Sequence, residues 1–341
     1  MKYTVDAAFA ALDDNLNLDP AVRRKAQERH NAIREVLAAA GLIASSFLQG
    51  SFARKTMLKP LKDVDIVCLL PEAFWQQLRG PDGPGKAMEW FKTPIKARWP
   101  EVEFDAGDEP SGKALRLSFP DCEFTIDLVP AFEYKDDYIL IGDRHEGTWT
   151  PSNSRIQLKK VSDRNQQTDG RFVHQVRELK ALTKHHEELE FISGIVVESL
   201  AYAVIGRKML DKDAVAAVLQ HAATAVSGPV MEPAGDDVTA KWTAEERATA
   251  AQVFAQAARR AAEALRLERA GEVDGAIDVW HSLFGDAFPT ASQRSVADTM
   301  AAWAAGSVTS TGRPSTTRAA TQQAAPGRSW SWSHPGPWFS R

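Results

Sequence analysis

The first half of the chain mixes helical and extended patterns of hydrophobic residues. Apolar positions recur at helical spacing over residues 5–16 and 20–40, with Asp19-Pro20 at the start of the second helix and Gly41 at its end. Short apolar or alternating runs predict strands, the last of them ended by Pro130, at residues 44–49, 65–70, 102–105, 114–119 and 123–129. Further helices are predicted at residues 71–78 and 86–99, and a short one leads from the turn Gly50-Ser51 to Met57.

In the second half the hydrophobic period becomes helical. The region before residue 170 is mixed, and its polar run NQQTDGR is predicted to be a loop. Apolar stripes then predict helices at residues 172–186, 192–210, 213–226, 243–269 and 273–283. After about residue 305 the composition becomes typical of a flexible tail, yet it ends in SWSWSHPGPWFSR. Disorder alone does not explain these tryptophans, and docking on the domain or on a partner stays open.

Composition narrows the class of protein. At 341 residues, 44% hydrophobic and 25% charged, the chain is expected to form one large globular domain or two intimate ones. The net charge of −4 gives no general basic surface for coating nucleic acid, and a local basic patch stays open. No stable nucleic-acid partner is expected. Without a segment of signal-peptide type or of membrane-spanning length, we expect a cytoplasmic protein with no membrane contact. Cys68 and Cys122 are expected to be buried free thiols. Two cysteines are too few for a cysteine-rich zinc site.

The candidate chemistry lies in three aspartates. Asp63 and Asp65 share one face of a predicted strand, because alternate residues of a strand point the same way. Asp127 lies in a second strand, FTIDLV, with Ile126 and Leu128 pointing away from it. Three clustered carboxylates are unfavourable without cations between them, so this set predicts a site for two divalent cations. Two such ions are what in-line displacement at a nucleoside triphosphate requires.

The turn Gly50-Ser51 precedes the first two aspartates by a short spacer. Ser51 can offer its hydroxyl and backbone N–H to the β- and γ-phosphates of a nucleotide. A lone Asp-x-Asp would more simply be the end of a surface strand. The combination with Gly-Ser and a third strand aspartate favours a nucleotidyl-transfer centre.

These motifs, GSFARKTMLKPLKDVDI and IDLVPAF, resemble the polymerase-β-like nucleotidyltransferases. The resemblance is closer to the CD-NTase family, the bacterial relatives of cyclic GMP-AMP synthase and oligoadenylate synthase, and is strong over residues 45–135. It implies an α+β fold, in which a polymerase-β-like core with a mixed sheet and helices packs on a C-terminal α-helical lobe. The corresponding domains are a catalytic core at 1–165, a helical lobe at 166–304 and a tail at 305–341.

The resemblance also implies roles for individual residues. Gly50 and Ser51 would contact the triphosphate, and Asp63, Asp65 and Asp127 would hold two Mg²⁺ or Mn²⁺ ions, with Asp127 beside the attacking hydroxyl. A helical lysine and a following serine hold the phosphates from the opposite lobe in this family, and here they correspond to Lys180 and Ser193. Lys180 can instead be a solvated helix lysine, and Ser193 can instead be a helix N-cap. Glu198 is offset from the position where the family often has a glutamate.

Other candidates carry weaker signals. Arg54 and Lys55 lie beside the Gly-Ser turn, where solvation is the simpler interpretation than screening of phosphate charge. Adjacent histidines on a helix point in different directions, so His185 and His186, with Glu187, are not expected to bind a metal. Asp105 and Asp108 are read as polar loop residues.

The function implied is synthesis of a cyclic di- or trinucleotide second messenger from NTPs, ATP among them, in bacterial anti-phage signalling. Regulatory or effector proteins of the same defence system are the expected partners. The alternative is another transferase on this fold, one that tails RNA or nucleotidylates a protein or small molecule. An RNA-tailing enzyme should show a basic groove, which the mildly acidic composition does not favour. A catalytically dead module is disfavoured because all three aspartates are present.

Overall fold

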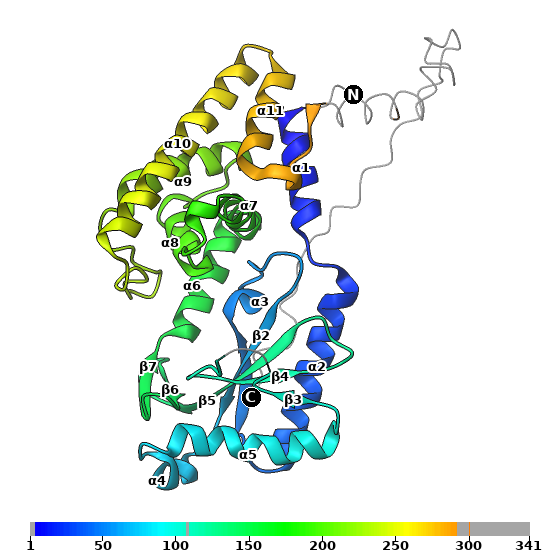
Figure 1. Cartoon of the computed structure of the whole chain (residues 1–341), viewed down its shortest axis with the longest axis vertical. Helices are drawn as coiled ribbons and strands as arrows, with labels where there is room; N and C mark the ends of the chain where they lie inside the picture. Colours follow the sequence, from blue (N-terminus) through cyan, green and yellow to red (C-terminus); the bar gives the residue numbers. More distant parts are fainter. Residues whose placement is uncertain (1–3, 107–108, 292–299, 301–341) are drawn as a thin grey trace. The chain divides into compact units, whose positions relative to one another are not determined.

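The computed structural model describes residues 4–106, 109–291 and 300, so Asp108 and the predicted tail at 305–341 lie outside the described residues. The predicted α+β class is confirmed (Figure 1). In chain order, the elements of the sheet-containing half are α1 Val5–Leu16, α2 Pro20–Ala39, β1 Ser45–Gln49, α3 Gly50–Arg54, β2 Asp63–Leu69, η1 Glu72–Phe74, α4 Trp75–Leu78, α5 Gly83–Arg98, β3 Glu103–Phe104, β4 Leu115–Ser118, β5 Thr125–Glu133, β6 Ile139–Asp143 and β7 Thr148–Ser152. The helical half that follows comprises α6 Ser154–Gln167, α7 Arg171–His185, η2 Glu187–Leu189, α8 Gly194–Val204, α9 Asp211–Ala225, α10 Ala244–Arg269, α11 Val273–Phe284 and η3 Gly285–Ala287.

A mixed sheet forms the centre of the first half. Its strands run in the order β1-β2-β5-β4-β3, and β6 extends it by pairing with both β5 and β7. Only β2 and β5 are parallel among the paired strands of the described residues. The hairpin turn predicted at Pro120-Asp121 joins the antiparallel pair β4 and β5.

The two faces of the sheet are buried unequally. Val64 and Ile66 of β2, with Ile126 and Leu128 of β5, point into the large hydrophobic core that α2 and α5 cover. Alternate residues point to the other face, where Val67 and Val129 belong to a smaller cluster. Asp63 and Asp65 on β2 and Asp127 on β5 point the same way as these valines, so the aspartates lie on this second face.

The prediction that Pro130 ends its strand is wrong, because β5 continues to Glu133. A residue in a central strand normally donates its N–H to a neighbouring strand, and proline has no N–H to donate. On one side of β5 the pairing with β4 ends at Leu128, and the pairing with β6 begins at Ala131. Pro130 occupies the gap between these two partners, where no donor is required.

Four other features of the structure differ from the expectations. The hairpin β6–β7 was not predicted, and helix α6 extends into the NQQTDGR run, so only residues 168–170 form the expected loop. The helix predicted at 192–210 is shorter, since α8 ends at Val204 and Leu210 is already the extended N-cap of α9. Cys68 is a buried free thiol as predicted, while the free thiol of Cys122 is only half-buried.

The helical half packs around buried aromatic rings. Phe9 of α1 contacts Trp280, Phe284 and Phe288 edge-on, with ring centroids 5.0, 5.9 and 5.1 Å away. Helix α10 begins with a complete capping box between Thr243 and Glu246. The predicted domain boundary at residue 165 falls inside α6 and stays a prediction.

Candidate active site

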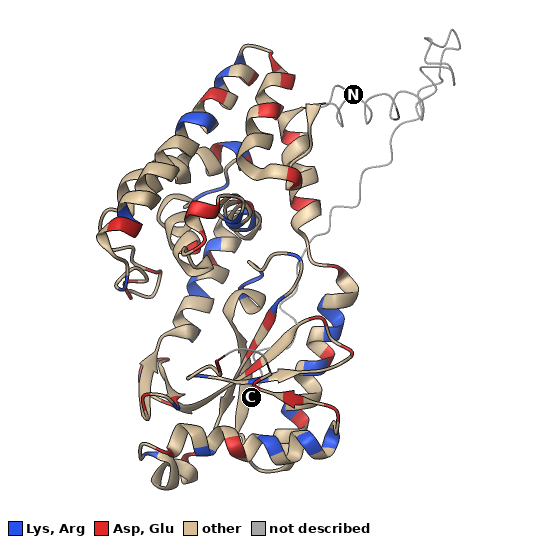
Figure 2. Cartoon of the chain, in the orientation of Figure 1, with Lys and Arg blue, Asp and Glu red and all other residues tan. Residues whose placement is uncertain are grey.

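The structure brings the aspartates of two distant segments together. In the parallel pairing of β2 with β5, Asp65 lies directly opposite Asp127, and Asp63 lies opposite Thr125. All three carboxylates lie on the sheet face away from the main core, because their neighbours Val64, Ile66, Ile126 and Leu128 occupy that core. Figure 2 shows acidic positions along the strands of this sheet.

Gly50 is fitted closely to this set of carboxylates. It lies at the end of β1, whose last residue pairs with Asp65, and its φ is +70°. A Cβ at Gly50 would lie 3.0 Å from Asp65 Cγ and closer still to Oδ2. Glycine is therefore required both by the backbone conformation and by the space that the carboxylate occupies.

The carboxylates affect each other's ionisation. Burial raises the pKa of Asp65 to about 6, and the charges of Asp63 and Asp127 act in the same direction. The pKa of Asp63 is also raised, first by burial and then by Asp127. Both shifts show that negative charge on this face is costly until a cation compensates it.

Arg116 is a neighbour of the site that sequence reasoning missed. It lies on β4 in register with Asp127, and its Nε and Nη2 donate to the two carboxylate oxygens at 3.2 and 3.4 Å. The hydrogen bond with Asp127 raises the pKa of Arg116. The alternation of β4 could have indicated that Arg116 faces the aspartates, but the register between β4 and β5 is not visible in the sequence.

The donor set fits a hard divalent cation. Three carboxylates on one face are the oxygen ligands that Mg²⁺ and Mn²⁺ accept, and the raised pKa of Asp65 shows a site short of positive charge. As the side chains stand in the described residues, no three acidic, histidine or cysteine side chains form a ready metal cage. Asp127 is instead held by Arg116, so the three carboxylates would have to converge around the ion.

Lys180 is not the solvated lysine that its helical position also allows. It is buried on α7, and its Nζ donates to the backbone oxygen and the hydroxyl of Thr56 at 3.1 and 3.0 Å. The carboxylate of Glu198 lies 3.6 Å from the same Nζ. Burial lowers the pKa of Lys180 to about 8, although Glu198 acts against that shift.

Ser51 and Ser193 lie at the starts of two helices, α3 and α8. Ser193 is exposed and is the N-cap of α8, yet its hydroxyl makes no capping hydrogen bond. The adjacent Gly194 lies against Lys180, since a Cβ there would be 3.3 Å from Nζ. Ser51 is half-buried in the first turn of α3, and its carbonyl accepts from Thr56 N at 3.0 Å. Ser51 and Lys180 thus both bond to Thr56, and Ser193 precedes a glycine that lies against Lys180.

Positive charge near Asp63 also comes from two lysines that sequence reasoning did not single out. The pKa of Lys184 on α7 is lowered, first by partial burial and then by the nearby charge of Lys62, while Asp63 acts against that shift. Lys184 therefore lies within electrostatic range of Lys62 and Asp63. Two cations beside the carboxylates are suited to a polyanionic substrate.

Arg54 is held inside the protein rather than solvated as expected. Its Nε forms an ion pair of 2.6 Å with Glu198, and its Nη1 donates to Gln157 at 2.7 Å. Lys55, the other basic neighbour of the turn, is exposed and has a left-handed backbone with φ 61°. Arg54 therefore anchors the short helix α3, which begins at the Gly50-Ser51 turn, to Glu198 and Gln157.

The remaining candidates have structural surroundings. Asp105 accepts two hydrogen bonds from Arg144, at 2.9 and 3.0 Å, which joins β3 to the end of β6. His185 packs against Gly285. The absence of a role in the site stays a prediction for both residues.

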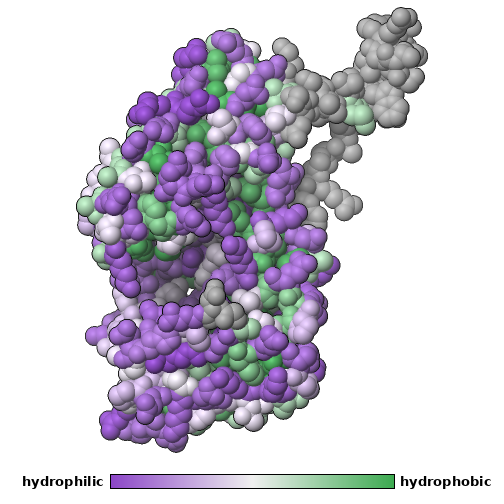
Figure 3. Space-filling model, in the orientation of Figure 1, coloured by the Kyte–Doolittle hydropathy of each residue, from purple (hydrophilic) through white to green (hydrophobic). Residues whose placement is uncertain are grey.

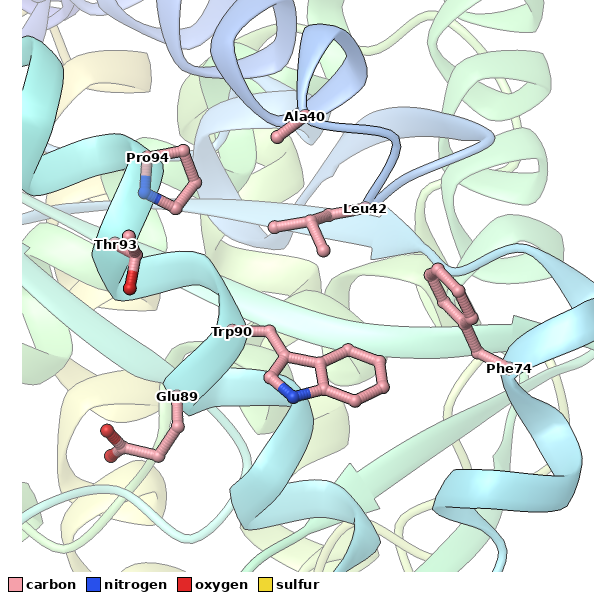
Figure 4. A pocket seen from close by; sticks show the side chains of 7 residues that line it. All are labelled: Ala40, Leu42, Phe74, Glu89, Trp90, Thr93 and Pro94. Carbon is pink, nitrogen blue, oxygen red and sulfur yellow. The ribbon is translucent and has the colours of Figure 1, made fainter.

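An apolar groove of about 510 Å³ lies elsewhere on the molecule (Figure 4). It is lined by Leu42, Phe74, Trp90 and Pro94 among others, from the end of α2, η1 and α5. None of the candidate site residues borders it. The groove therefore does not describe the nucleotide site.

Hydrophobic positions on the surface are scattered among hydrophilic ones on the face drawn in Figure 3. Among the helices of the described residues, none has both the length and the apolar character needed to cross a bilayer.

Comparison with known proteins identifies the family. The Second Messenger Oligonucleotide or Dinucleotide Synthetase domain matches residues 3–165. A Bacillus cereus (strain VD146) protein named a probable cyclic nucleotide synthase is 22% identical over 277 residues, which cover 71% of this chain and 81% of that protein.

Solved structures share the fold at low sequence identity. CdnC of Escherichia coli MS115-1, in a complex with HORMA-deltaN, matches with a TM-score of 0.66 at 14% identity, over 82% of this chain and 96% of that chain. The CD-NTase CdnG of Bradyrhizobium diazoefficiens, in complex with GTP, matches with a TM-score of 0.65 at 16% identity, over 87% and 99% of the two chains. The domain match over residues 3–165, the relative and the shared fold together support membership of this chain in the CD-NTase family of nucleotidyltransferases.

Proposed function

We propose that this chain joins nucleoside triphosphates, ATP among them, into a cyclic di- or trinucleotide second messenger that acts in bacterial anti-phage signalling. The observation that carries the proposal is the register of Asp65 with Asp127, with Gly50 fitted against the Asp65 carboxylate. Family membership supports the class of product, and the relatives solved with ATP and with GTP support nucleoside triphosphates as substrates.

Each residue has a role in this reaction. A ribose hydroxyl attacks the α-phosphorus, the bond to the bridging oxygen breaks, and pyrophosphate leaves. The hydroxyl proton passes to a carboxylate oxygen of Asp127 or to solvent. Ser51 binds the β- and γ-phosphates with its hydroxyl and N–H, and Lys180 and Ser193 bind them from the side of α7 and α8.

Asp63, Asp65 and Asp127 would hold two Mg²⁺ ions. When bound, these ions supply charge neutralisation at the attacking hydroxyl and at the leaving pyrophosphate. The carboxylates orient the ions, and the added positive charge relieves the raised pKa values of Asp63 and Asp65. Arg116 releases Asp127 as the three carboxylates converge.

Regulation is proposed to come through protein partners of the same defence system. The CdnC relative was solved in a complex with HORMA-deltaN, which supports control by a protein. The net charge of −4 supports the expectation of no stable nucleic-acid partner.

The test is incubation of the chain with radiolabelled NTPs and Mg²⁺ or Mn²⁺, followed by phosphatase treatment and mass spectrometry. We expect a phosphatase-resistant oligonucleotide from the native chain and none from Asp63→Ala/Asp65→Ala. Asp105→Asn is the matched control, because this aspartate holds Arg144 and lies outside the candidate set. If the NTPs stay intact while a supplied RNA gains nucleotides only with the native chain, RNA tailing replaces the proposal.

A further inference from the structure

A buried group of four polar side chains lies next to the Gly50-Ser51 turn. It consists of Arg54, Thr56, Lys180 and Glu198, and we call it the buried charge cluster. Glu198 is completely buried on α8, and the side chains of Arg54 and Lys180 are only 9% and 8% exposed. Two cations and one carboxylate thus meet in a place that water barely reaches.

Glu198 is the centre of this cluster. One carboxylate oxygen forms the 2.6 Å ion pair with Arg54 Nε, and the other accepts a hydrogen bond of 2.8 Å from the Thr56 hydroxyl. The Thr56 hydroxyl in turn accepts from Lys180 Nζ at 3.0 Å, so its proton and its lone pair are both used. The two cations are joined through a single carboxylate.

Removing that carboxylate would leave two cations buried side by side. An unpaired buried charge is strongly unfavourable, and the lysine can relieve it by losing its proton, whereas arginine cannot. Burial already lowers the pKa of Lys180 to about 8. The charged groups that face Lys180 are Glu198 from α8, Arg54 from α3 and Lys184 from α7, and only Glu198 favours the protonated form.

The cluster is continuous with both sides of the proposed phosphate site. Arg54 ends the short helix that begins at Gly50, and Thr56 N is bonded to Ser51 O at 3.0 Å. On the other side, Lys180 lies against Gly194, the residue after Ser193. Glu198 therefore touches the support of the turn and the lysine at the same time.

We propose that Glu198 is a positioning residue that holds Arg54 and Lys180 in place, so that Ser51 and a protonated Lys180 meet the triphosphate together. This inference rests on the proposed function. The net excess of one positive charge in the buried charge cluster complements the oxygens of a triphosphate. Glu198 itself contacts no substrate, since it is fully buried beneath these groups.

The first experiment compares Glu198→Gln with the native chain. Equilibrium binding of a non-hydrolysable ATP analogue with Mg²⁺ is measured between pH 6 and 9.5, together with kcat and KM. We expect Glu198→Gln to bind about tenfold more weakly at pH 8. We also expect the alkaline loss of binding to move at least about one pH unit lower, because Lys180 has lost the charge that kept it protonated.

Glu178→Gln is the matched control. Glu178 lies on the same helix as Lys180 and is also fully buried, and burial raises its pKa well above the ordinary value. Burial favours the neutral form of its carboxyl, and glutamine copies the shape and the charge of that form. We expect the binding and the pH profile of this variant to match those of the native chain.

Thr56→Val tests the same inference without changing a charge. It removes the hydroxyl that links Lys180 to Glu198, so we expect a smaller shift in the same direction, and this variant decides the question if Glu198→Gln does not fold. Glu198→Asp should restore part of the native pH profile. If Glu198→Gln or Thr56→Val is folded and retains native affinity and an unshifted alkaline limb, Glu198 has no positioning role. If the native chain itself neither binds the analogue nor consumes NTPs, the proposed function fails first.

Discussion

Replacing Gly50 by alanine is expected to have two effects, one on the backbone conformation and one on the Asp65 carboxylate. Alanine at φ +70° costs about 1–2 kcal/mol of conformational free energy. The new methyl also overlaps the Asp65 carboxylate, because a Cβ would lie only 3.0 Å from Cγ and closer still to Oδ2. A normal contact requires the carboxylate to move by roughly 1 Å. The side chain can rotate away, so the displacement falls on the geometry of the site rather than on folding.

The structure supplies a matched control at Gly41. Its φ is +69°, and a Cβ there would meet nothing within 4 Å. Gly41→Ala should therefore lose the same stability, about 1–2 kcal/mol, without any effect on Asp65. The difference between the two variants isolates the contact with the carboxylate.

We expect both variants to unfold a few degrees below the native chain in a thermal scan. In a steady-state assay of NTP consumption with Mg²⁺, Gly50→Ala should lose on the order of 100-fold in kcat/KM, because a misplacement of this size is costly in catalysis. Gly41→Ala should keep native activity once folded. Equal activities of the two variants would refute the close fit between Gly50 and Asp65.

Three further predictions concern stability. Asp65→Asn should raise the free energy of unfolding of the metal-free chain at pH 7.5 by about 1–3 kcal/mol, because the carboxylate with its pKa raised to about 6 destabilises the fold when ionised. In urea titrations this gain should disappear below about pH 4. His30 is buried and its pKa is lowered to about 4, so the native chain should lose up to about 3 kcal/mol as the pH falls from about 6.5 to 4. A chain with His30→Leu that shows the same acid loss would contradict this cause. Phe9→Ala should cost about 3–5 kcal/mol in urea unfolding, since Phe9 is buried against Trp280, and a loss below 1 kcal/mol would count against the packing described.

Local patterns predicted the parts of the fold and site that depend on neighbouring residues. The strand with Asp63 and Asp65, the turn at Gly50 and most helices follow from periodicity and turn residues within short windows. The roles assigned to the aspartates, to Ser51, Lys180 and Ser193 remain predictions.

The features that the sequence did not indicate depend on how distant segments of the chain align with each other. The pairing of Arg116 with Asp127 follows from the alignment of β4 with β5. The burial of Arg54 follows from its contact with Glu198, far along the chain. The end of the strand at Pro130 was predicted wrongly for the same reason. Only the pairing of β4 and β6 with β5 shows that no neighbouring strand needs an N–H from Pro130. Periodicity contains no information about such pairings.

The buried charge cluster has a consequence for synthesis of the chain on the ribosome. Glu198 is 142 residues away from Thr56, and it is translated long after the strands that carry the aspartates. Until it emerges, Arg54 lacks the carboxylate that pairs with it, and the nascent core has its three aspartates without a complete buried charge cluster. A fragment that stops at residue 165, where the matched domain ends, would stay in that incomplete state. Nucleotide chemistry would therefore begin only after most of the chain has been made.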